Sequence, residues 1–211
     1  MFKHITDAKT ALKAFNDIIS SELKRPGYGL LLDFIEETDF KTAPASTKYH
    51  GSNKGGLLMH SVGVYYALKD LAKLFDYEEK ETGEFAICGL FHDLCKADTY
   101  KATYKNVKTY EINDSIPKDI IKYDPVLRKE YAWISQPTYT FDEQFTFGHG
   151  EKSVYLLQRF IPVYPLEAQA IRYHMGAFRA EDINSVGKVY ESNKLAWLLH
   201  VADEYDTYWL K

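Results

Sequence analysis

The 211-residue chain lacks the features of several protein classes. Its two cysteines, Cys88 and Cys95, are too few for a disulfide framework or a four-thiolate zinc site. No run of about 18 apolar residues is present to span a bilayer, and the first residues lack the apolar core of a signal peptide. We therefore expect a cytoplasmic protein with reduced thiols and no membrane partner.

Excess basic charge is also absent. The chain has 26 Lys and Arg against 30 Asp and Glu, which gives a net charge of -4. Without an overall basic field, long duplex nucleic acid is not an expected partner. A small anionic substrate is still compatible with this charge, because a metal site would supply its own local positive charge. The 45% hydrophobic and 27% charged residues are typical of a folded globular protein.

Three common catalytic motifs are missing as well. The sequence contains no G-x-S-x-G nucleophile elbow, no Walker A loop and no H-E-x-x-H pair. The unusual feature that is present is a high aromatic content, with 17 Tyr and 12 Phe against 3 Trp. Several of the tyrosines lie between residues 100 and 140.

Apolar residues recur at helical spacing through most of the chain. Between the first helices and the third, residues 38–56 carry the Pro, Ser, Asn and Gly of a loop. The expected helices cover residues 7–24, 28–37, 57–75, 82–94, 149–161, 165–176 and 190–209.

Residues 98–147 break the helical pattern. The segments YKATYKNVKTYEI and EYAWISQPTYTF alternate polar with aromatic or β-branched residues, which predicts a β-hairpin inserted into a helical protein. Two interpretations of its aromatic residues are open. They could cover the mouth of a site and stack on a nucleobase, or they could form a small cluster of their own. The residues in question are Tyr100, Tyr104, Tyr110, Tyr131 and Trp133.

Most of the seven histidines lie at helix ends or loop edges. Imidazole and carboxylate are the usual ligands of divalent first-row metals, and helical bundles hold such ions with side chains from several helices. In the adjacent pair His92-Asp93, the carboxylate could bridge two ions while the imidazole binds one of them. Taken alone, this pair is equally compatible with a structural role. His4 and His200 are expected to be ordinary surface or core residues, although His200 shares a helical face with Asp203.

The order His60, His92-Asp93, His149, His174, Asp203 resembles the H…HD…H…H…D pattern of the HD superfamily of metal-dependent phosphohydrolases. The local strings GGLLMHSVGV, LFHDLCK, FGHGEKSV, AIRYHMGAF and LLHVADEYD are similar to the corresponding family segments. The string APASTKYHGSNKGGLLMH is similar to HD domains of the 3′-to-5′ exoribonuclease and relaxase-associated type. It departs from them at His50-Gly51, where they carry two successive histidines.

This resemblance implies an all-α fold, namely an HD-domain helical bundle with a small β-hairpin-like insertion. We expect one domain over residues 1–211. Within it, N-terminal helices would occupy 1–43, the first half of the metal site 44–97, the Tyr-rich insertion 98–147 and the second half of the site 148–211.

The resemblance also implies the ligands of a site for two divalent ions. His60, His92, Asp93 and Asp203 would hold one ion, and Asp93 would bridge to a second ion completed by His149 and His174. Such ligands suit Mn, Fe, Co, Ni, Mg or Zn without distinguishing among them. The ions would lower the pKa of a bridging water and neutralise charge on the phosphoryl oxygens.

Basic residues near the ligands suggest further roles. Lys96 matches the lysine of the family's HDxxK variant and, with Asp93, is the candidate catalytic residue; its alternative is a solvated lysine favoured by the helix dipole. His50, Lys54 and Lys152 are candidate substrate-binding residues, and the two lysines could equally be solvated surface charges.

The function that follows is hydrolysis of a phosphoester or phosphodiester in a nucleotide or a short single-stranded nucleic acid. Two other classes remain open, namely a di-iron oxygenase on the same fold and a binding module that has lost catalysis. Iron-dependent oxygen uptake would favour the oxygenase, and absence of bound metal would favour the binding module.

Overall fold

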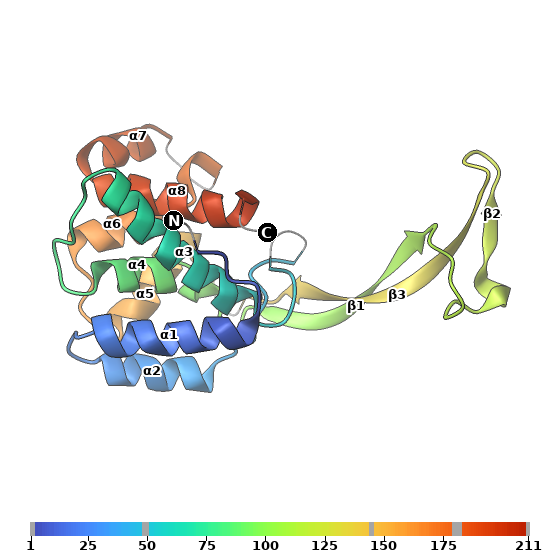
Figure 1. The fold of residues 1–211 in the computed structure, drawn as a ribbon, viewed down its shortest axis with the longest axis horizontal. Helices are drawn as coiled ribbons and strands as arrows, with labels where there is room; N and C mark the ends of the chain where they lie inside the picture. Colours follow the sequence, from blue (N-terminus) through green and yellow to red (C-terminus); the bar gives the residue numbers. More distant parts are fainter. Residues whose placement is uncertain (1–2, 48–50, 144–145, 179–182, 210–211) are drawn as a thin grey trace.

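In a computed structural model, which describes residues 3–47, 51–143, 146–178 and 183–209, helices form a body from which a long β-ribbon projects (Figure 1). The helices are α1 (Ala8–Glu22), α2 (Tyr28–Glu37), α3 (Gly56–Leu74), α4 (Glu84–Phe91), α5 (His149–Gln158), α6 (Pro165–Tyr173), α7 (Ile183–Ser192) and α8 (Lys194–Trp209). Short 3-10 turns lie at η1 (Leu94–Lys96), η2 (Lys118–Ile120) and η3 (Gly176–Phe178).

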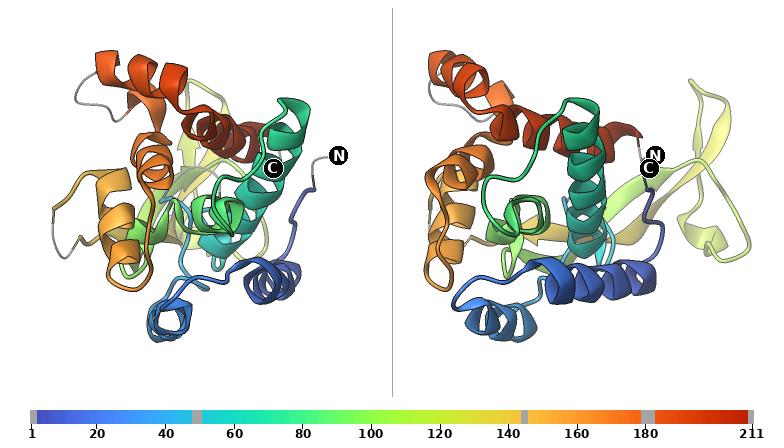
Figure 2. Two further views of the ribbon diagram at one scale, coloured as in Figure 1. Left: turned by 90° about the vertical axis from the view of Figure 1, so that its left-hand side faces the viewer. Right: turned by 60° about the vertical axis from the view of Figure 1, so that its left-hand side comes forward.

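Helix α3 lies at the centre of the body and packs against α1, α4 and α8, while α6 packs against α5 and α8 (Figure 2). Buried side chains from these helices form one hydrophobic cluster. Three phenylalanines of this cluster, Phe15, Phe40 and Phe91, contact one another with ring centroids about 6 Å apart. This core fixes the C-terminal end of α4, where the His92-Asp93 pair follows.

A buried ion pair joins the α1–α2 connection to the start of α6. The Arg25 guanidinium donates to both carboxylate oxygens of Glu167, with N–O distances of 2.6 and 2.5 Å, and also to the carbonyls of Thr82 and Pro162. Glu167 in turn accepts from the backbone N–H of Tyr164, which caps α6. Because each charged group is paired and hydrogen-bonded, the burial cost of the pair is offset.

The prediction of an all-α fold is wrong. Residues 98–147 contain a three-stranded antiparallel sheet in the order β1-β3-β2, formed by β1 (Tyr100–Thr109), β2 (Lys122–Asp124) and β3 (Lys129–Phe141). Strands β1 and β3 pair in register from Tyr100–Phe141 to Thr109–Ala132, and β2 pairs with the start of β3. The fold is therefore helix-rich but mixed, because the alternating segments extend into long paired strands rather than a small decoration.

The predicted helices up to residue 176 occur with ends shifted by a few residues, but the last one is divided. In place of one helix over 190–209, α7 and α8 meet at Asn193. Its side-chain amide donates to the carbonyl of Leu166, and its Oδ1 accepts from the backbone N–H of Ala196. An asparagine that hydrogen-bonds to backbone in this way favours a helix end over a continuous helix. Within the described ranges, no helix combines the length and apolar character needed to cross a membrane.

Candidate metal centre

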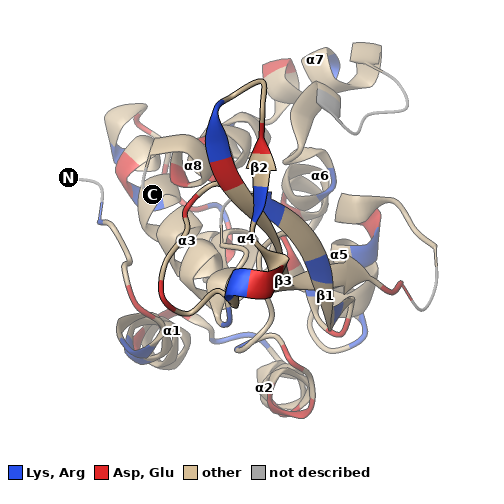
Figure 3. Cartoon of the chain, turned by 90° about the vertical axis from the view of Figure 1, so that its right-hand side faces the viewer, with Lys and Arg blue, Asp and Glu red and all other residues tan. Residues whose placement is uncertain are grey.

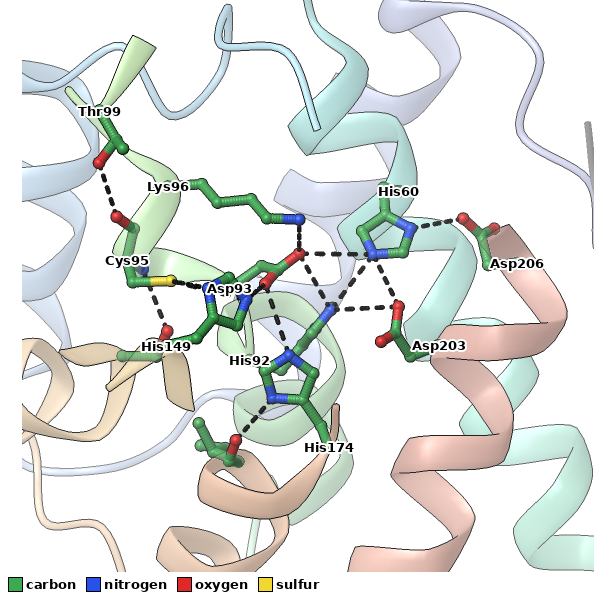
Figure 4. A network of polar contacts seen from close by, with 12 residues as sticks. His60, His92, Asp93, Cys95, Lys96, Thr99, His149, His174, Asp203 and Asp206 are labelled. Atoms are coloured by element: carbon green, nitrogen blue, oxygen red, sulfur yellow. Dashed lines mark hydrogen bonds and ion pairs between the residues drawn. The ribbon is translucent and has the colours of Figure 1, made fainter. Parts of the chain in front are cut away.

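The six predicted metal ligands come together in the helical body, although they derive from five different parts of the chain (Figure 4). His60 lies on α3, and His92 and Asp93 follow the last residue of α4. His149 begins α5, His174 follows α6, and Asp203 lies on α8. Five of the six are buried, and the His149 side chain is 21% exposed.

Hydrogen bonds fix which nitrogen of three imidazoles faces the cluster. Nδ1 of His92 lies 3.0 Å from the carbonyl oxygen of Gly89, and Nδ1 of His174 lies 2.6 Å from that of Ile171. Since a carbonyl oxygen can only accept, both Nδ1 atoms carry the proton. Nδ1 of His60 similarly donates to Asp206 Oδ2 at 2.7 Å. All three rings therefore direct Nε2 toward the same space, as expected of imidazole ligands held by a second hydrogen bond.

One half of the cluster gathers around His60 and His92. Their Nε2 atoms are only 3.3 Å apart. Asp203 Oδ1 lies 3.1 Å from Nε2 of His60 and 3.9 Å from Nε2 of His92. Asp93 Oδ2 lies 3.6 and 3.5 Å from the same two nitrogens. Four groups that can donate an electron pair thus converge on one point.

The other half gathers around the second oxygen of Asp93. Oδ1 lies 2.7 Å from Nε2 of His149 and 3.6 Å from Nε2 of His174. The two oxygens of a single carboxylate therefore face two separate pairs of imidazoles. This is the arrangement that a carboxylate bridging two cations requires.

The electrostatics of both halves favour positive charge. Burial opposes protonation of His60, but Asp203 and Asp206 outweigh it and raise the pKa of His60 to about 10. Burial also opposes protonation of His149, yet Cys95 and Asp93 raise its pKa to about 10. The pKa of His92 is lowered to about 3, chiefly by burial. The same negative groups that favour a proton on His60 and on His149 would favour a metal cation in each half.

The residues present fit a metal ion. Nε2 of His174 is buried and has no hydrogen-bond partner in the part of the chain that the structure describes, which is costly unless the atom serves as a ligand. Among the described residues, three overlapping groups of donor atoms within 4.8 Å of one another could hold an ion. One of them includes Cys95, whose Sγ lies 3.3 Å from Nδ1 of His149. Because Nε2 of His149 faces Asp93 whereas the thiol contacts Nδ1, we favour His149 and Asp93, rather than Cys95, as the ligands from this group.

The predicted catalytic and substrate-binding lysines differ in position. Lys96 Nζ lies 2.5 Å from Asp93 Oδ2, at the edge of the cluster. Lys152 is buried on α5 and pairs with Glu143 at 3.3 Å. Lys54 is exposed in the turn before α3. His50 lies outside the described residues.

Sequence analysis missed Asp206, which contacts Nδ1 of His60. It lies three residues after Asp203, so one face of α8 presents both carboxylates to α3. Gly63 makes room for it, because a Cβ there would lie 1.9 Å from Asp206 Oδ1. His200 supports the cluster indirectly, since its Nδ1 lies 2.7 Å from the carbonyl oxygen of His174. Its position three residues after Asp203 is the feature of the sequence that could have identified Asp206 as a neighbour of the site.

No family model, no curated protein and no solved structure matches the chain. The chemistry of the site must therefore be argued from its own residues. What those residues establish is a set of buried His and Asp side chains that could hold a metal ion.

Proposed function

We propose that the chain is an HD-type phosphohydrolase with two divalent metal ions, acting on a phosphoester or phosphodiester of a nucleotide or a single-stranded nucleic acid. The observation that carries the proposal is the Asp93 carboxylate, whose two oxygens face separate imidazole pairs. The order of the ligands along the chain, which resembles the HD pattern, supports the same conclusion. When bound, such ions polarise phosphoryl oxygens and lower the pKa of a water molecule.

The side chains around the cluster suggest how a phosphate would be bound. Burial falls from His60 toward His149 and Lys96, whose side chains are 21% and 13% exposed. We infer that the substrate approaches from this side. Lys96 pairs with the Asp93 carboxylate at this edge of the cluster, where its ammonium group would be in position to pair with a phosphoryl oxygen.

Metal content provides the first test. The purified chain loaded with Mn²⁺ should contain close to two ions per molecule, and Asp93→Asn should lose both because it removes the bridge. His149→Ala should lose mainly the second ion. Lys54→Ala is the matched control, because Lys54 is exposed outside the cluster. A wild-type chain with no bound metal would contradict the proposal and favour a binding module.

Activity provides the second test. The Mn²⁺-loaded chain should release product from nucleotides or short oligonucleotides, and Lys96→Ala should reduce kcat more than metal content. Replacing Lys96 by Arg should restore part of the rate, because the charge is retained. No product from any phosphate ester with metal bound would contradict the proposal. Oxygen uptake that depends on Fe²⁺ and that Mn²⁺ cannot support would instead favour an oxygenase.

A further inference from the structure

The β-ribbon presents a line of aromatic side chains on one of its two faces. Strands β1 and β3 pair without a bulge, so residues at alternate positions lie on the same face. This places Tyr100, Tyr104, Trp133, Tyr139 and Phe141 together, and we call them the aromatic face. The opposite face instead carries Lys101, Thr103, Lys105, Gln136, Thr138 and Thr140.

The rings of the aromatic face are available for contact. Tyr104 is 74% exposed, Phe141 61% and Trp133 53%, which is unusual for such large apolar groups. They occupy every second pair of this face, with Phe141 opposite Tyr100, Tyr104 opposite Pro137 and Trp133 opposite Lys108. At about 3.4 Å per residue, the ten-residue β1 carries this face over roughly 30 Å.

The aromatic face begins beside the candidate metal centre. Tyr100 comes four residues after Lys96, the last residue of η1, and the hydroxyl of Thr99 donates to the carbonyl of Cys95, so β1 starts against the turn that carries Lys96. The ribbon then leads away from the helical body (Figure 1). It does not form a lid over the site, which was one of the two interpretations of the sequence.

Charge distinguishes the ribbon from the rest of the chain. Strands β1 and β3 together contain four lysines and one glutamate, whereas the chain as a whole carries a net charge of -4. Figure 3 shows basic positions recurring along β1 and both signs of charge around β2. Lys108 lies over the ring of Tyr131 with Nζ 4.0 Å from the centroid. The two strands therefore offer a polyanion a positive balance of charge that the chain as a whole does not have, with Lys101 paired to Asp142 and Lys108 to Asp124.

We propose that the aromatic face binds a single-stranded nucleic acid and directs one end of it to the metal centre. Exposed rings combined with nearby lysines, here Lys108 on the aromatic face and Lys101 and Lys105 on the opposite one, are the usual surface for stacking unpaired bases along a charged backbone. A mononucleotide would occupy only one ring, and the bases of a duplex are already stacked on one another. The inference rests on the proposed function and selects the strand, rather than the free nucleotide, as substrate.

Binding can be tested apart from catalysis. The full chain would be titrated in EDTA against a fluorescein-labelled single strand of about 12 nucleotides, as RNA and as DNA, and against a duplex and a mononucleotide. Single strands should bind most tightly. Tyr104→Ala and Trp133→Ala should each weaken binding on the order of tenfold, and Tyr104→Phe should retain it because the ring remains. Tyr123→Ala is the matched control, since Tyr123 pairs with Glu130 and belongs to the opposite face.

Several outcomes would overturn the inference. The first is that the chain binds the duplex as tightly as the single strand. The second is that it binds the single strand no more tightly than the mononucleotide. The third is that Tyr104→Ala and Trp133→Ala bind the single strand as tightly as the wild-type chain. A concentration-dependent dimer that these substitutions disrupt would assign the face to a second copy of the chain instead. Strand binding without cleavage in Mn²⁺ would contradict the proposed function alone, whereas mononucleotide hydrolysis without strand binding would contradict this inference alone.

Discussion

Replacement of Asp206 should weaken metal binding although this residue is not a predicted ligand. Its carboxylate accepts from Nδ1 of His60 at 2.7 Å and so directs Nε2 toward Asp203 and Asp93. Loss of such a partner typically lowers metal affinity about 10- to 100-fold. For Asp206→Ala we therefore expect a loss of about 1.4 to 2.7 kcal/mol in metal-binding free energy. Asp206→Asn should lose less, because its amide oxygen still accepts the hydrogen bond.

A second variant perturbs the same contact without changing either partner. In Gly63→Ala the new methyl group would lie 1.9 Å from Asp206 Oδ1, so the carboxylate must move away from its present position. We expect a loss of metal affinity similar to that of Asp206→Ala. Ser61→Ala is the control on the same helix, because its buried hydroxyl makes no hydrogen bond to any residue that the structure describes.

The assay is competition for Mn²⁺ or Zn²⁺ against a chromophoric chelator, with metal content measured at the end point. Circular dichroism at the same temperature would show that each variant is folded. Wild-type affinity in folded Asp206→Ala would refute the reasoning, because the orientation of His60 would then not depend on this carboxylate.

Three further predictions concern stability. Arg25→Met leaves Glu167 charged and buried, so we expect a loss of about 3 to 5 kcal/mol in urea unfolding; a loss below about 1 kcal/mol would contradict this. Asp7 caps α1 through the backbone N–H and hydroxyl of Thr10, which lower its pKa below 3.8. Its charge therefore stabilises the fold above pH 3.8 and ceases to do so as the pH falls through the lowered pKa. In thermal melts Asp7→Asn should remove this pH dependence while Asp7→Ala also removes the cap. Finally, Mn²⁺ at 100 times its Kd should stabilise the chain by about 2.7 kcal/mol, or roughly 5 to 11 °C in Tm, and should leave Asp93→Asn unchanged.

The helical part of the fold follows from the sequence because each helix must bury one face. Apolar spacing gives α1, α2, α3 and α6 to within a few residues. The separation of α7 from α8 was missed because it depends on hydrogen bonds from Asn193 to Leu166 and Gln169, which lie on α6, 27 and 24 residues away in the sequence. The three-residue β2 is too short to produce a periodic pattern.

The ligands of the candidate site were predicted from their order along the chain, and three of them, His92, His149 and His174, stand at helix ends. Helix ends that face one core bring His92, His149 and His174 together even when the crossing angles of the helices are unknown. The direction of each ring was not predictable, because it depends on carbonyl oxygens such as those of Gly89 and Ile171. The same limit explains why Lys152 was a candidate for phosphate binding, since its partner Glu143 lies before the helix in a segment without a pattern.

The ribbon should be separable from the metal centre, because its two ends are held together where they leave the body. The backbone N–H of Asp142 donates to the carbonyl of Thr99 at 2.8 Å, and the antiparallel register continues outward from there. Joining Thr103 to Thr138 through Asn-Gly, a dipeptide suited to a two-residue hairpin turn, would remove the outer ribbon and keep this closure. We expect metal content and hydrolysis of a small phosphodiester to be retained while single-strand binding is weakened, because Tyr104 and Trp133 are removed. Loss of metal from the folded, shortened chain would show instead that the ribbon holds the ligands in place, because the closure between Thr99 and Asp142 would then not suffice to position Asp93 against His149.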